Sequence, residues 1–98
     1  MAGMGSQMKM LNQMRKVQKE LAREIVEVEA GDGAVVIQFN GEMKVVSVKL
    51  DASKIDLDDI SELEAWLQAA IRDGLKEAQD MAAEKMKPLM GGLGNLGL

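Results

Sequence analysis

The chain has 98 residues, 47% of them apolar and 29% charged, which is the composition of one small globular domain. It contains neither cysteine nor histidine, which excludes thiol nucleophiles, Cys/His zinc sites and histidine-based catalytic triads built from this chain alone. The formal net charge is −4 at pH 7, but residues 1–24 carry +3 and the remaining residues carry −7, so a surface that binds anions is expected near the N-terminus.

A first amphipathic helix is predicted over residues 8–25. Apolar residues recur there at helical spacing and form one stripe, Met10, Met14, Val17, Leu21 and Ile25. The opposite side carries cations, namely Lys9, Lys16, Lys19 and Arg23, with Arg15 beside them. Lys19 and Arg23 lie four residues apart with no acid between them on that sector of the helix, and a bound anion would relieve their repulsion. The alternative is a solvated face stabilised by pairs such as Lys16 with Glu20.

Three short antiparallel strands are predicted after this helix. Residues 25–30 alternate between apolar and polar and end at a turn of Gly31, Asp32 and Gly33. Two further alternating runs, residues 34–39 and 43–50, meet at Asn40-Gly41. This dipeptide predicts a tight hairpin turn, because Gly and Asn tolerate positive φ.

A second amphipathic helix is predicted over residues 61–87. Ser61 stands three residues before Glu64, which is typical of a capping box, and Pro88 is expected to end the helix. Its apolar stripe consists of Leu63, Leu67, Ala70, Ile71, Gly74, Ala78 and Met81. The helix would be roughly 40 Å long, so its stripe extends past a small sheet and needs cover from the first helix and from a second subunit.

The organisation is therefore one domain, residues 8–90, with flexible Gly-rich ends at residues 1–7 and 91–98. The glycines of the tail lack the strand and helix that a nucleotide-binding loop requires. The acids at residues 56–59 lack the Gly and Glu of a calcium loop. We expect no metal, no cofactor and no catalytic residues, so an enzyme is disfavoured. The chain shows neither a signal-peptide pattern nor an apolar run long enough to span a membrane, which favours a cytoplasmic protein without a membrane partner.

Several short segments follow one another in an order seen in a known family. They are Gly33 to Ile37, Asn40-Gly41, Val46 to Val48, Leu50-Asp51, Leu63-Glu64, Ala69-Ala70 and Glu84 to Met86. Their order, with a Met- and Gln-rich first helix, resembles the YbaB/EbfC family of bacterial nucleoid-associated proteins. The resemblance implies an α+β protomer of order αβββα, with a three-stranded antiparallel sheet and two long flanking helices. It also implies a tweezers-like homodimer that binds DNA with little sequence preference.

We therefore expect a homodimer in the nucleoid that binds double-stranded DNA through backbone phosphates, with a role in gene regulation or nucleoid organisation. The expected DNA-binding residues are Lys9, Arg15, Lys16, Lys19 and Arg23 of both subunits. The alternative is an adaptor whose Met-rich helix tips bind a protein partner. In that alternative Met1, Met4 and Met90 would contact the partner, while Met10, Met14 and Met81 are expected in the core or at the dimer contact.

Overall fold

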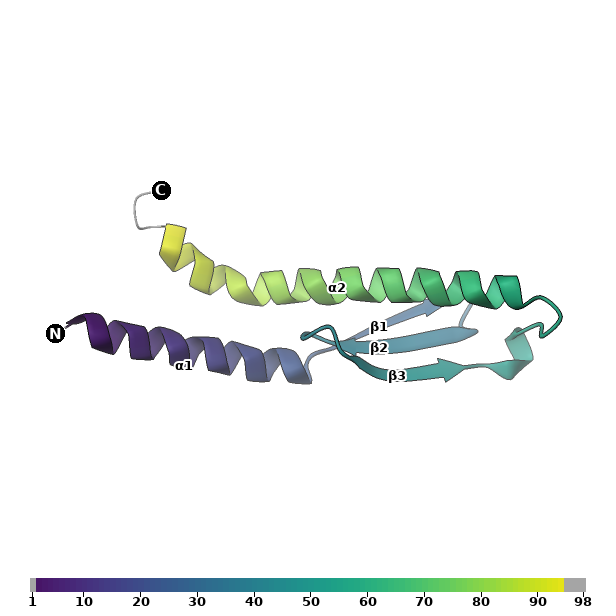
Figure 1. Cartoon of the computed structure of the whole chain (residues 1–98), viewed down its shortest axis with the longest axis horizontal. Helices are drawn as coiled ribbons and strands as arrows, with labels where there is room; N and C mark the ends of the chain where they lie inside the picture. Colours follow the sequence, from purple (N-terminus) through teal and green to yellow (C-terminus); the bar gives the residue numbers. More distant parts are fainter. Residues whose placement is uncertain (1, 95–98) are drawn as a thin grey trace.

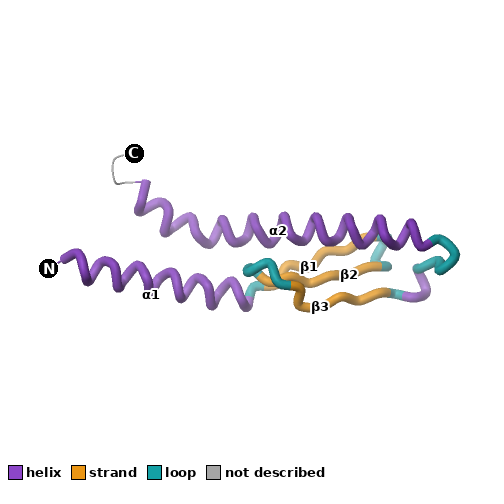
Figure 2. Tube along the Cα trace, viewed as in Figure 1, coloured by secondary structure: helices purple, strands orange, loops and turns teal. Residues whose placement is uncertain are grey.

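Two long helices and a three-stranded sheet make up the structure (Figure 1, Figure 2). The computed structural model describes residues 2–94, and the side chains of residue 5 and residues 7–89. The elements, in chain order, are α1 (Ala2–Arg23), β1 (Ile25–Ala30), β2 (Val35–Asn40), β3 (Val45–Leu50), a short 3-10 helix η1 (Ala52–Lys54) and α2 (Ile60–Gly94). The predicted αβββα order is confirmed. Both long helices extend past the same end of the sheet (Figure 1), which makes the molecule 68 Å long and 25 Å wide.

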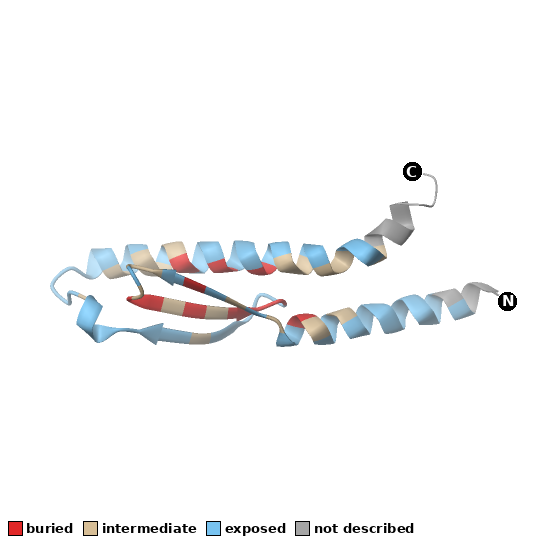
Figure 3. Ribbon diagram, turned by 180° about the vertical axis from the view of Figure 1, so that it is seen from behind, coloured by how far each residue is buried: buried red, intermediate tan, exposed pale blue. Residues whose placement is uncertain are grey.

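The sheet is antiparallel with strand order β1-β2-β3. Val28 is paired with Ile37, and Ile37 with Val48. Directly opposite residues of antiparallel strands point to the same face, so these three side chains share one face. α2 packs on this face over β1 and β2. The core, coloured red on β2 and on the facing side of α2 in Figure 3, consists of Val28, Val35, Ile37, Phe39, Ala70 and Ala78.

β3 lies outside the cover that α2 provides. Val48 and Leu50 are paired with the buried Ile37 and Val35, and therefore lie on the core face of the sheet. Their exposed fraction is nevertheless 52% each, because α2 contacts β1 and β2 rather than β3. The core face of the sheet thus ends in an exposed apolar strand.

The turn between β2 and β3 is longer than the sequence predicted. The Met43 N–H donates to the carbonyl of Asn40 (3.0 Å), and the Asn40 N–H donates to the carbonyl of Lys44 (2.9 Å). Residues 41–43 are therefore a three-residue loop, in which a turn is followed by a left-handed residue. That residue is Met43, with φ of 63°, and not Gly41. The predicted hairpin is confirmed, but the positive φ expected at Asn40-Gly41 occurs at Met43 instead.

The start of α2 differs from its predicted capping box. The helix begins at Ile60, and the carboxylate of Asp59 accepts the N–H of Glu62 at 3.3 Å. Asp59 is thus the capping residue, with a glutamate three positions later. The capping box predicted at Ser61 and Glu64 is therefore wrong by two residues.

Both helices also extend beyond their predicted outer ends. α1 begins at Ala2 rather than at residue 8, and α2 passes through Pro88 and ends at Gly94. A proline within a helix removes one hydrogen bond and crowds the preceding turn, which bends the helix; Figure 1 shows a bend near this end of α2. The flexibility of residues 1–7 and 91–98 stays a prediction, and residues 95–98 lie outside the described residues. In the described part of the chain, no helix has the length and apolar character to cross a membrane.

A glycine in α2 allows the helix to pack closely on β2. A Cβ at Gly74 would overlap the ring of Phe39, which is 1% exposed. We expect Gly74→Ala to lower the free energy of unfolding by about 2 kcal/mol, because the overlap outweighs the roughly 1 kcal/mol that alanine gains in helix propensity. Urea unfolding followed by the fluorescence of Trp66 measures this change. Gly5→Ala in α1 is the control, since nothing lies within 4 Å of its added Cβ. Equal stability of Gly74→Ala and the wild type would contradict a tight contact.

Candidate nucleic-acid interface

The C-terminal end of α1, which we call its base, is fixed by the hairpin between β2 and β3. The Gly41 N–H donates to the carbonyl of Leu21 at 2.7 Å, and Nδ2 of Asn40 donates to the carbonyl of Ala22 at 3.4 Å. Carbonyls in the last turn of a helix have no partner within the helix, so the hairpin caps α1. A Cβ on Gly41 would lie 2.7 Å from the Leu21 carbonyl oxygen. Glycine is therefore required here by the close approach of α1.

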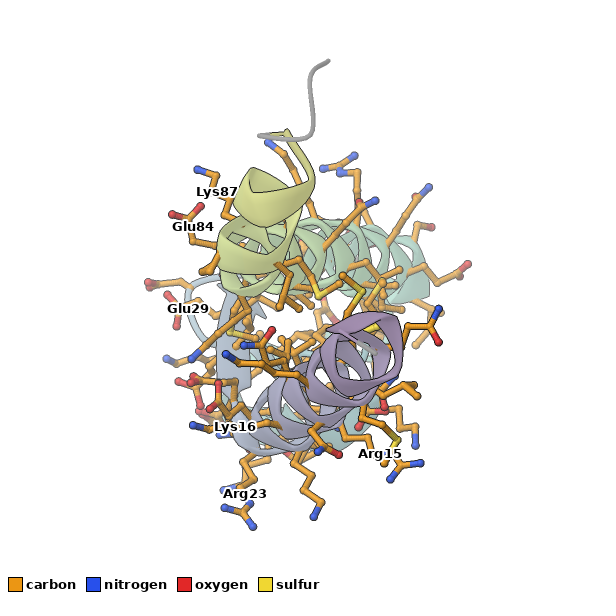
Figure 4. The ribbon with its side chains drawn as sticks, turned by 90° about the vertical axis from the view of Figure 1, so that its left-hand side faces the viewer. Arg15, Lys16, Arg23, Glu29, Glu84 and Lys87 are labelled. Atoms are coloured by element: carbon orange, nitrogen blue, oxygen red, sulfur yellow. The ribbon has the colours of Figure 1, made fainter. Side chains whose placement is uncertain are left out.

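The predicted cations of α1 are all exposed to solvent. These residues are Lys9, Arg15, Lys16, Lys19 and Arg23. Within residues 5 and 7–89, none of them takes part in an ion pair. Figure 4 looks along the helices and shows Arg15 and Arg23 pointing away from α2, with Lys16 pointing to one side. From Lys9 to Arg23 the cations span about 21 Å along the helix axis, roughly the length of six base pairs.

The apolar stripe of α1 is covered only at its base. Leu21 is buried and Val17 is half-buried, whereas Met14 and Met10 are 39% and 45% exposed. The outer half of α1 extends beyond the sheet (Figure 1). Met10 and Met14 are therefore not core residues of the protomer, and their contact with a second subunit stays a prediction.

The acids closest to these cations in the sequence are paired with α2. Nζ of Lys85 lies 3.2 Å from Oε1 of Glu24 and 3.7 Å from Oε2 of Glu20. The hydrogen bond and charge of Glu24, followed by the charge of Glu20, raise the pKa of Lys85 above its ordinary value. The ammonium therefore stays charged throughout the neutral range and loses its charge as the pH rises through that raised pKa. The pair of Lys16 with Glu20 considered from the sequence is not formed.

The polar surface of α2 offers a mixed charge. Lys87 lies 3.0 Å from Glu84, and Arg72 lies 3.6 Å from Asp73. Lys76 lines a groove beside β1 in which the other charged residues are acids, namely Glu27, Glu29, Asp73, Glu77 and Asp80. A phosphate approaching α2 would meet negative charge beside each of these cations, so α1 is the better phosphate-binding surface.

Three residues of this interface were not identified from the sequence. The sequence predicts a turn at Asn40 and Gly41, and nothing local in it shows that they also cap α1. Lys85 did carry a signal, because it falls on the apolar stripe of α2, where a charged side chain needs a partner. Its partners on α1 became visible only with the fold.

Comparisons of the sequence with known proteins indicate one family. The model of the YbaB/EbfC DNA-binding family matches residues 1–93. A nucleoid-associated protein of Chloroflexus aurantiacus is 45% identical over 87 residues, covering 89% of this chain and 87% of that protein. One from Syntrophobacter fumaroxidans is 43% identical over 87 residues, covering 89% and 79%. The crystal structure of an uncharacterized protein from Helicobacter pylori shares the fold, with a TM-score of 0.79 at 22% identity and coverage of 88% of this chain and 90% of that one. The chain therefore belongs to the YbaB/EbfC DNA-binding family.

Proposed function

We propose that the protein is a nucleoid-associated homodimer that binds duplex DNA through the phosphates, with the cations of α1 as the contacts. One observation carries this proposal. The five cations of α1 are exposed and without ion pairs in the described part of the chain, while the two nearest acids are paired with Lys85. Neutralisation of phosphates by Lys and Arg supplies nearly all of the affinity in non-specific DNA binding. A nucleoid location, with a role in nucleoid organisation or gene regulation, would follow from this activity.

Little sequence specificity is expected. The chain has one Phe and one Trp; Phe39 is buried and Trp66 is packed against the core. Neither aromatic side chain is therefore available to insert between bases. Contacts to phosphates fix the position of a protein on DNA but do not read the sequence.

The apolar surface left open on the protomer supports a homodimer. The exposed strand β3 lies at the edge of the sheet. α2 contributes a groove lined by Leu67, Ile71 and Leu75, of which the last two are exposed. Contiguous apolar patches and unpaired strand edges are typical of interfaces. The other edge strand, β1, carries the exposed acids Glu27 and Glu29, which disfavour pairing there. A second copy of the chain is therefore expected on the β3 side.

Fluorescence anisotropy of a labelled duplex of about 30 base pairs, at 50 and 200 mM salt, tests the DNA-binding function. We expect saturable binding with a Kd of roughly 1 μM at 50 mM salt, weakened about 100-fold at 200 mM, as for neutralisation of about four phosphates. A second duplex of unrelated sequence is expected to bind with a similar Kd. Absence of binding at both salt concentrations would overturn the proposal.

The exposed Met10 and Met14 support the alternative function, a protein-binding adaptor. The side chains of Met1, Met4 and Met90 lie outside those that the structure describes. Apolar contacts resist salt, whereas phosphate contacts do not. A specific partner that stays bound at 500 mM salt to a chain that binds no DNA would favour the adaptor.

A further inference from the structure

Lys85 contacts the two acids that lie among the cations of α1 in the sequence. Glu20 and Glu24 are the only acids among the first 24 residues. Glu20 lies four residues after Lys16 and three before Arg23, the spacings at which opposite charges pair on a helix. In the structure both acids contact Lys85 instead, at 3.7 and 3.2 Å.

The contact is made across a groove between the two helices. Gln13, Lys16 and Val17 line it from α1, and Pro88 and Leu89 from α2. The side chain of Lys85 is 36% exposed, and those of Glu20 and Glu24 are 43% and 42% exposed, so these ion pairs remain open to solvent. Lys16 lines the same groove and yet forms no ion pair within the described side chains. Among the described side chains, Lys85 rather than Lys16 is thus the cation that contacts Glu20.

We propose that Lys85 is a positioning residue for DNA binding: it holds the carboxylates of Glu20 and Glu24 and thereby leaves Lys16 and Arg23 available to phosphates. This inference rests on the proposed function of α1. Residues 1–24 carry a net charge of +3, and the charge of Lys85 offsets one of their two negative charges. Because exposed ion pairs contribute little to stability, removing Lys85 is expected to affect DNA binding more than folding.

Four variants measured by anisotropy at 50 mM salt test the proposal. Lys85→Gln is expected to weaken binding about tenfold, the effect of losing roughly one phosphate contact. Lys85→Arg is expected to bind like the wild type, because it keeps the charge. Glu20→Gln with Glu24→Gln is expected to change the affinity of the wild type less than about threefold, because Lys85 already holds both carboxylates away from Lys16 and Arg23. The same two changes in Lys85→Gln are expected to restore the lost affinity. Circular dichroism monitors the fold of each variant.

The outcomes separate this role from two others. If the two Gln substitutions raise the affinity by the same factor with and without Lys85, then Lys85 acts independently as a phosphate contact and the proposal is overturned. If Glu20→Gln with Glu24→Gln weakens DNA binding as much as Lys85→Gln does, the ion pairs act by orienting α1. That result also overturns the proposal. Unchanged binding of Lys85→Gln would overturn this inference alone. Absence of DNA binding by the wild type would overturn the proposed function as well.

Discussion

Replacing Lys16, Lys19 and Arg23 by glutamate is expected to abolish DNA binding and to leave the protein folded. The change reverses the net charge of residues 1–24 from +3 to −3. Each phosphate contact contributes about one order of magnitude near 0.1 M salt, so three lost contacts and three added repulsions lower the affinity by more than about 10³-fold. All three side chains are exposed and form no ion pair in the described part of the chain, so the effect on folding is small. Anisotropy measures the binding and circular dichroism the fold.

The matched control makes the same change in charge on α2. Arg72, Lys76 and Lys87 are replaced by glutamate, and these cations lie beside acids. We expect a loss of affinity below about tenfold, because distant charges act on DNA only through a screened field. Equal losses in the two variants would show that the net charge of the protein, rather than the position of the cations on α1, determines the affinity for DNA. Unchanged affinity in the α1 variant would contradict the assignment of the phosphate contacts to α1.

The cations of α1 could be grouped from the sequence because helical geometry alone decides which side chains share a side. The strands could be located for a similar reason, since alternation follows directly from the pleat of a sheet. Val28, Ile37 and Val48 belong to the three alternating runs and lie together on the core face of the sheet. Periodicity does not show how far a neighbouring element extends. It could not predict that α2 would leave Val48 exposed.

The errors in the prediction occurred where a distant contact, or a competing local residue, decides the structure. Asn40-Gly41 is typical of a turn that needs positive φ. Gly41 does not have a positive φ, however, and glycine is required because the backbone of Leu21 lies too close for a Cβ. Asp59 rather than Ser61 caps α2, since either residue type can fill that position. The pairing of Lys85 with Glu20 joins residues far apart in the chain, and local charge spacing favoured Lys16 instead. Local rules therefore located the elements and the cations, whereas the contacts that orient α1 required the fold.

Val48→Asp is expected to convert the dimer into a folded monomer that binds DNA at least about 100-fold more weakly. Its side chain is 52% exposed in the protomer, so an aspartate there is tolerated in the isolated chain. In a dimer formed through β3, two carboxylates would be desolvated without partners, which costs several kcal/mol each. Light scattering after gel filtration is expected to give a mass of 10.6 kDa for the variant and twice that for the wild type. The loss of DNA affinity follows because the dimer links two α1 helices. Linking two binding elements raises the overall affinity by about 100-fold or more.

Ile25→Asp is the matched control for this variant. Ile25 is also an apolar strand residue, 47% exposed, but it is paired with Asn40 on the face of the sheet opposite to Val48. The same charge introduced there is expected to leave the dimer and its DNA affinity close to those of the wild type. A dimeric Val48→Asp would place the subunit contact elsewhere. The exposed stripe of α1 at Met10 and Met14 and the groove of α2 at Ile71 and Leu75 are apolar surfaces that a second copy could then cover. If Val48→Asp is monomeric and binds DNA with unchanged affinity, a single α1 is sufficient for binding. Dimerisation would then stabilise the sheet edge and would not contribute to the contact with DNA.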